Sequence, residues 1–150
     1  GPRHLVFHPS NGYMYVLNEL DNTVAQIGKE NERYSVKTVT SILPEDFDAF
    51  SKAADIHISK DGKFIYASNR GHDSIAILEV AEDGSLTLIA NEHTKGKDPR
   101  NFQLTPDEKF VIVANQNSNN LVSYTRDHET GLMTYASEIA APTPVCILFE

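Results

Sequence analysis

The sequence repeats itself three times in one register. Each copy contains an apolar or aromatic residue, two small or aliphatic residues and an asparagine: Tyr15-Val-Leu-Asn18, Tyr66-Ala-Ser-Asn69 and Ile112-Val-Ala-Asn115. The units begin at Pro2, Ala53 and Pro99, and a fourth beginning falls at Pro144, so the spacings are 51, 46 and 45 residues. Such periods are typical of blade-like or solenoid repeats. Positions where the copies differ are therefore candidates for function.

Each unit reads as four β-strands. Runs rich in Val, Ile and Tyr alternate with clusters of Gly, Pro, Asn and Asp, the pattern of strands joined by turns. In the second unit the runs are 56–58, 64–68, 75–80 and 85–92. A four-stranded antiparallel unit that recurs about every 45 residues indicates a β-propeller blade. Helical solenoids are disfavoured because the apolar residues do not recur at i, i+3 and i+4.

The predicted fold is all-β, a partial β-propeller of three four-stranded blades and the first strand of a fourth. The expected boundaries are 2–52, 53–98 and 99–143 for the blades and 144–150 for the last strand. Three blades and a strand cannot close a ring, and a propeller protects the unpaired edges of its sheets by closing the ring of blades. We therefore expect the C-terminal part of a larger propeller, with the missing blades N-terminal to Gly1, or completion by self-association.

One short helix is predicted between the first and second blades, at Pro44 to Ala54. Proline is favoured in the first turn of a helix, and Phe47 and Phe50 are three residues apart. This insertion accounts for most of the extra length of the first unit.

Charge and composition argue against several classes of function. The formal net charge is −8, from 13 basic and 21 acidic residues, which opposes binding to nucleic acid or to an anionic membrane surface. No apolar run approaches the roughly 18 residues of a membrane span, and no export signal opens the chain. The single cysteine, Cys146, permits no intrachain disulfide and is expected to be a small buried apolar side chain. We expect a cytoplasmic protein.

The rim of the central channel is the predicted place for chemistry. The first two strands of a blade are antiparallel, so the start of one and the end of the other share a rim. The residues gathered there are Arg3, His4, Glu19, Asp55, Arg70, Arg100, Asn101 and Gln116. At one equivalent position the copies carry Glu19, Arg70 and Gln116, whereas the preceding residue is always asparagine and is interpreted as structural.

The charged set permits two interpretations. Arg3, Glu19 and Arg70 could form a surface salt-bridge network, which stabilises little. Alternatively, the guanidiniums bind a carboxylate or phosphate while Glu19 acts as a general acid or base. No His or Cys spacing indicates a metal site, and neither a Gly-rich phosphate loop nor a G-x-S-x-G elbow is present. We expect a small anionic ligand, no cofactor and no metal.

Several longer segments resemble a known family. They are Gly1-Pro-Arg-His-Leu-Val-Phe-His-Pro9, Tyr15-Val-Leu-Asn-Glu19, Ile56-His-Ile-Ser-Lys-Asp-Gly62, Tyr66-Ala-Ser-Asn-Arg-Gly-His-Asp-Ser-Ile75, Asp98-Pro-Arg-Asn-Phe102 and Thr143-Pro-Val-Cys-Ile-Leu-Phe149. They resemble the C-terminal blades of the seven-bladed β-propeller lactonases, which include cycloisomerase-type 6-phosphogluconolactonases and the fungal 3-carboxy-cis,cis-muconate lactonizing enzyme. The likeness covers essentially the whole chain.

The resemblance implies a site at the channel mouth. Arg3, Glu19 and Arg70 match an arginine, a glutamate and a second arginine of the family and are the expected catalytic residues, with His4, Arg100 and Gln116 as substrate-binding residues. A further family histidine has no counterpart here, so these 150 residues alone are expected to be inactive. The implied activity is hydrolysis of a sugar-acid lactone of the 6-phosphogluconolactone type. Cyclisation of a carboxymuconate and a non-catalytic propeller scaffold are the alternatives.

Overall fold

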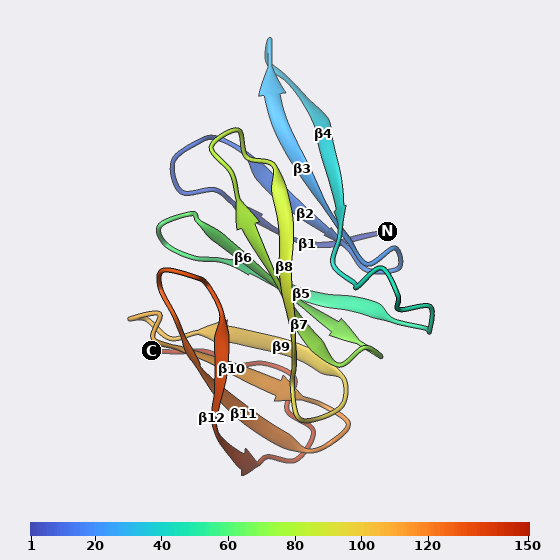
Figure 1. Ribbon diagram of the computed structural model, residues 1–150, viewed down its shortest axis with the longest axis vertical. Helices are drawn as coiled ribbons and strands as arrows, with labels where there is room; N and C mark the ends of the chain where they lie inside the picture. Colours follow the sequence, from blue (N-terminus) through green and yellow to red (C-terminus); the bar gives the residue numbers. More distant parts are fainter.

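The computed structural model describes residues 1–150 as three four-stranded antiparallel sheets without helices (Figure 1). The first sheet contains β1 (Pro2–Phe7), β2 (Met14–Asn18), β3 (Thr23–Glu30) and β4 (Arg33–Ser41). The second contains β5 (Lys52–Ile58), β6 (Phe64–Arg70), β7 (Ser74–Val80) and β8 (Leu86–His93). The third contains β9 (Pro99–Leu104), β10 (Phe110–Asn115), β11 (Asn120–Arg126) and β12 (Met133–Ala140). The prediction of three four-stranded blades is confirmed. The structure holds no helix that could cross a membrane.

The three sheets are packed face to face in chain order (Figure 1). Strand β6 illustrates how the middle sheet packs against both of its neighbours, because successive side chains of a strand point to opposite faces of the sheet. Its Ile65 packs in a cluster shared with the first blade, whereas Tyr66 packs in a cluster shared with the third. Both side chains are fully buried, which stabilises the fold by roughly 1.5–3 kcal/mol for a large apolar side chain. The middle blade is thus apolar on both faces, as its sequence requires.

The predicted helix at Pro44 to Ala54 is wrong. The segment forms a turn at Pro44, where Phe47 N donates to Pro44 O over 3.2 Å, and strand β5 already begins at Lys52. Strand β5 includes the last three residues of the predicted helix, Lys52 to Ala54. The residues that remain are too few to form a stable helix by themselves. Residues 43–51, called the 43–51 loop below, connect the first two blades instead.

The C-terminal residues 144–150 form no strand, contrary to the prediction. A first strand pairs with the second strand of its own blade, and this chain contains no such partner for it. One side-chain contact still marks the predicted place, since Ile147 N donates to Asn101 Oδ1 over 2.7 Å. In the preceding blade Phe102 N donates to Asp55 Oδ2 over 3.3 Å, at the equivalent repeat positions. Cys146 is exposed rather than buried, because no further sheet covers this segment.

Candidate functional site

One end of the three blades gathers the predicted site residues. The β-ladders place Pro2 opposite Asn18, Lys52 opposite Arg70 and Pro99 opposite Asn115. Each pair joins the start of a first strand to the end of a second, and β1, β5 and β9 are neighbours along the inner edge of the molecule. We call this end, defined by the three pairs and Glu19, the Glu19 rim. The inference from antiparallel geometry is confirmed.

Glu19 lies between two guanidinium groups from different blades. Its Oε1 accepts a hydrogen bond from Arg70 Nη2 over 2.6 Å, and its Oε2 accepts one from Arg3 Nη1 over 3.3 Å. Backbone carbonyls hold both arginines, because Arg3 Nε donates to Ala54 O over 2.7 Å and Arg70 Nη2 also donates to Ala53 O over 3.0 Å. The three charged residues that were predicted to meet do meet.

The charged group is partly shielded from water. The exposed fractions of the Arg3, Glu19 and Arg70 side chains are 23%, 27% and 13%. The hydrogen bond from Arg70 holds the pKa of Glu19 below its ordinary value, and the charge of Arg3 adds to this, while burial opposes it. Glu19 is therefore ionised at neutral pH. Arg70 Nε is buried without a hydrogen-bond partner, so this guanidinium has unused donor capacity.

The three residues predicted to bind substrate do not contact this group. His4 is exposed and its side chain makes no hydrogen bond. Arg100 and Gln116 are half-buried at the rim of the third blade, and neither side chain forms a hydrogen bond or an ion pair within the chain. Arg100 is thus a free cation at the Glu19 rim, on the strand beside β5.

Asp55 and Asn101 form a contact between blades rather than a part of the charged group. Asp55 Oδ2 accepts hydrogen bonds from Asn101 Nδ2 over 2.6 Å and from the ring of His57 over 3.1 Å. Burial raises the pKa of Asp55, but the hydrogen bonds from His57 and the backbone outweigh this and lower it overall. The carboxylate joins β5 to β9 directly below the rim.

The asparagines that recur at one position of the repeat were interpreted as structural, and the contacts of Asn69 and Asn115 agree with this. Asn69 Nδ2 donates to Ile42 O and Asn115 Nδ2 donates to Thr94 O, each over 2.9 Å. Each amide therefore fixes the backbone just past an outer strand. No group of three His, Cys, Asp or Glu side chains is placed to hold a metal ion.

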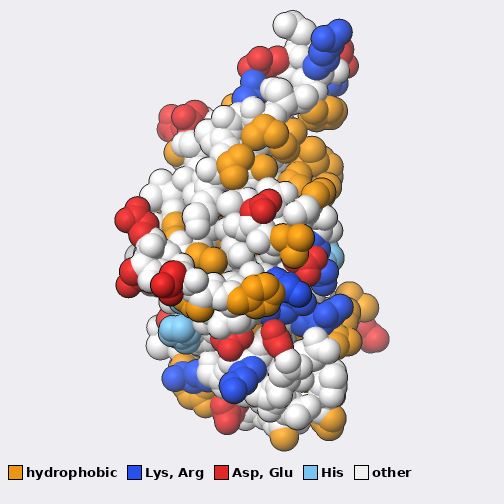
Figure 2. Space-filling model, turned by 90° about the vertical axis from the view of Figure 1, so that its right-hand side faces the viewer, with side chains coloured by type: hydrophobic (Ala, Val, Ile, Leu, Met, Phe, Trp, Pro, Cys, Tyr) orange, Lys and Arg blue, Asp and Glu red, His pale blue; other side chains and the backbone are white.

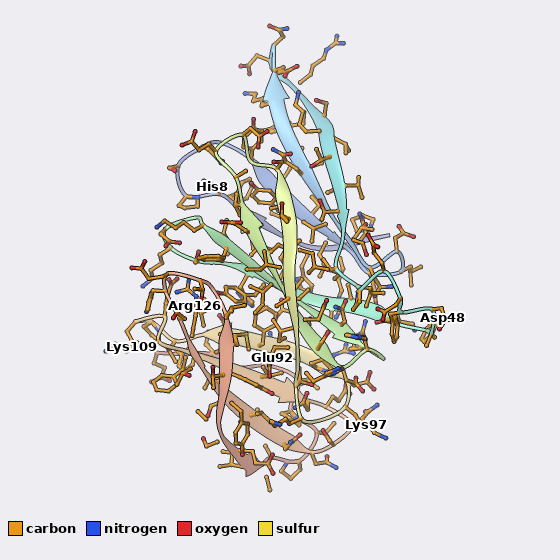
Figure 3. The ribbon with its side chains drawn as sticks, in the orientation of Figure 1. His8, Asp48, Glu92, Lys97, Lys109 and Arg126 are labelled. Atoms are coloured by element: carbon orange, nitrogen blue, oxygen red, sulfur yellow. The ribbon has the colours of Figure 1, made fainter.

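The 43–51 loop is fastened to the Glu19 rim. Asn22 Nδ2 donates to Ser51 O over 3.0 Å, and Ser51 Oγ donates to Arg70 O over 3.1 Å. Figure 3 shows Asp48 of this loop at one end of the blades and Lys109 at the opposite end. The loop therefore borders the charged group. Sequence reasoning missed its role because it assigned these residues to a helix.

Replacing Gly71 by alanine is expected to loosen this contact. Gly71 has φ +110°, and an added Cβ would lie 2.4 Å from Phe50 O. Strain at such a φ costs about 1–3 kcal/mol, and the clash with the backbone adds to it. Denaturant unfolding should show a larger loss of stability for Gly71→Ala than for Gly12→Ala, where φ is +78° but nothing lies within 4 Å. Equal losses would contradict the contact.

Comparison with known proteins gives a consistent picture. Residues 1–149 match the family described as "Lactonase, 7-bladed beta-propeller". The 6-phosphogluconolactonase of Bacillus subtilis is 40% identical over 153 residues, which cover 99% of this chain and 44% of that protein.

Solved structures agree in fold. A protein from Lactobacillus plantarum superposes with a TM-score of 0.93 at 38% identity, over 97% of this chain and 44% of that one. A periplasmic gluconolactonase from Pseudomonas aeruginosa superposes with a TM-score of 0.90 at 31% identity, over 96% of this chain and 41% of that one. The chain thus spans less than half the length of these relatives.

Proposed function

This chain belongs to the seven-bladed β-propeller lactonase family, and on that premise we propose that the whole protein hydrolyses a sugar-acid lactone of the 6-phosphogluconolactone type. The observation that carries the proposal is the carboxylate of Glu19 held between Arg3 and Arg70 at the rim. The names of the similar proteins from Bacillus subtilis and Pseudomonas aeruginosa support hydrolysis over cyclisation of a carboxymuconate.

Each charged residue has a part in the proposed reaction. A water molecule attacks the lactone carbonyl carbon and passes a proton to the carboxylate of Glu19. Negative charge develops on the carbonyl oxygen, and guanidinium groups stabilise it by charge-assisted hydrogen bonds. When the intermediate collapses, the bond from the carbonyl carbon to the ring oxygen breaks. That oxygen takes the proton back from Glu19, and the product is the open-chain acid.

Substrate binding would also change the strength of Glu19 as a base. Its lowered pKa makes it a weak base while Arg70 donates to it. An anionic substrate or intermediate competes for that guanidinium and draws it away from the carboxylate. The pKa of Glu19 then rises toward its ordinary value, so the base becomes stronger when substrate is present.

The pH profile of the reaction should follow from this arrangement. Because the ionised form of Glu19 is the base and its pKa is lowered in the free enzyme, kcat/KM should stay high until the pH falls below the ordinary range of glutamate, about 4.3. In Arg70→Met the acidic limb should move to higher pH, whatever the residual rate. Stopped-flow measurement of acid release across pH 3–7, a range set by that reference value, would test this. An unmoved limb would remove Arg70 from the control of Glu19.

The direct test of the proposal is an assay of the complete propeller. The protein should open 6-phosphogluconolactone faster than the spontaneous reaction and should not cyclise a carboxymuconate. We propose that the three blades form part of a seven-bladed ring whose other blades complete the substrate pocket. Absence of turnover on every sugar lactone would favour an interaction scaffold. A cytoplasmic location is part of the proposal, and cell fractionation would distinguish it from the periplasm.

A further inference from the structure

Lys52 is a cation at the Glu19 rim with no ionic partner. It lies opposite Arg70 in the ladder of β5 with β6, and directly paired residues of antiparallel strands point to the same face of a sheet. Its side chain therefore starts on the same face of the β5–β6 pair as the side chain of Arg70, at the same strand end. No carboxylate lies within ion-pair distance of it, although the net charge of the chain is −8. The next residue, Ala53, donates from its N to Glu19 O over 2.9 Å, which ties this strand start to the site.

An exposed aromatic ring positions the ammonium group. Lys52 Nζ lies 5.2 Å from the ring centroid of Phe50, and 75% of Phe50 is exposed. A cation over an aromatic face is attracted by the ring quadrupole, and this limits the freedom of the long lysine side chain. Phe50 itself belongs to the fastened end of the 43–51 loop, next to Ser51. Figure 2 shows Lys and Arg side chains gathered on this face beside hydrophobic side chains.

The two kinds of cation at the rim suit different anions. The guanidiniums of Arg3 and Arg70 are planar and already engaged with a carboxylate. A lysine ammonium is a compact point charge with three donors and is a common phosphate ligand. Lys52 is the ladder partner of Arg70 and forms no ion pair with Glu19, so an anion bound to Lys52 would lie beside the charged group rather than within it. Such a place fits a substituent remote from the ring ester.

We propose that Lys52, held over Phe50, recognises the phosphate group of a phosphorylated sugar lactone and makes the enzyme prefer it over the unphosphorylated lactone. This inference rests on the proposed function, since it names the feature by which the same site selects its substrate. Lys52 is a specificity residue and takes no part in bond breaking.

The test compares two substrates and two variants in the complete protein. For Lys52→Gln we expect kcat/KM to fall about tenfold or more with 6-phosphogluconolactone and to change little with glucono-δ-lactone. Only the phosphorylated substrate loses a charge-assisted hydrogen bond, the one between its phosphate and the lysine ammonium. Lys52→Arg should recover part of the loss. The matched control is Lys95→Gln, because Lys95 Nζ lies 5.2 Å from the ring of Tyr135, in the third blade and outside the charged group.

Binding of the products separates this inference from the proposed function. Calorimetry should show weaker binding of 6-phosphogluconate to Lys52→Gln and unchanged binding of gluconate, whether or not the protein turns over lactones. If wild-type protein hydrolyses both lactones and Lys52→Gln lowers both rates equally or neither, the role of Lys52 is overturned while lactone hydrolysis stands. If wild-type protein hydrolyses neither lactone, hydrolysis fails and the binding comparison alone decides for or against Lys52.

Discussion

Glu19→Gln in the complete propeller is expected to lower kcat for lactone hydrolysis on the order of 10³-fold, within the range of general base catalysis. The amide keeps the size of the side chain but cannot take a proton from water. The substitution also removes the negative charge that pairs with Arg3 of the first blade and Arg70 of the second. Release of acid from 6-phosphogluconolactone, corrected for spontaneous hydrolysis, measures the effect.

The control for this variant is another glutamate in an ion pair. Glu30 pairs with Lys37 Nζ over 2.5 Å, but 71% of its side chain is exposed and it lies at the far end of the β3–β4 ladder. Glu30→Gln should leave the rate unchanged. If Glu19→Gln retains normal turnover, the carboxylate is structural and the arginine–glutamate group is only a salt-bridge network between blades. A solution measurement of fold, such as circular dichroism, separates loss of catalysis from loss of structure.

The sequence predicted this group because the repeat supplies its geometry. Equivalent positions in successive copies fall on equivalent strand ends, so Glu19 and Arg70 had to share a rim once the strands were antiparallel. The same logic placed Asp55 and Asn101 at one rim, and the structure joins them by a hydrogen bond that the sequence did not specify. Short-range pattern and repeat period were sufficient to place these residues at the rim.

The features that were missed depend on contacts between distant residues. Nothing local in the 43–51 loop shows that Asn22 and Arg70 fix its end, so its proline and aromatic spacing favoured a helix. Lys52 was overlooked because it precedes the start of the repeat unit, although its place opposite Arg70 could have been read from the register. Cys146 is exposed because only a covering sheet would bury it, and the amino-acid composition does not show whether such a sheet is present.

Asp55→Ala is expected to cause the largest loss of stability among single changes at the rim. The carboxylate is 10% exposed, and its Oδ1 accepts a hydrogen bond from Ile56 N while its Oδ2 serves Asn101, Phe102 and His57. Removing it leaves those donors unpaired, which costs about 1–3 kcal/mol for each one that stays buried without a partner. Denaturant unfolding of the complete protein would measure this loss as a lower midpoint.

The pH dependence of that loss identifies its cause. Since the pKa of Asp55 is lowered in the folded protein, its contribution to stability is fully present above the ordinary aspartate pKa of about 3.9 and is lost as the pH falls through the folded value. The difference between wild type and Asp55→Asn should therefore be large at pH 6 and shrink toward pH 2, values chosen on either side of that pKa. The control is Asp48→Asn, because Asp48 is exposed and its carboxylate makes no hydrogen bond or ion pair, so the unfolding midpoint should match that of wild type across the range. A constant difference across this range would mean that packing, rather than the ionised carboxylate, joins the second blade to the third.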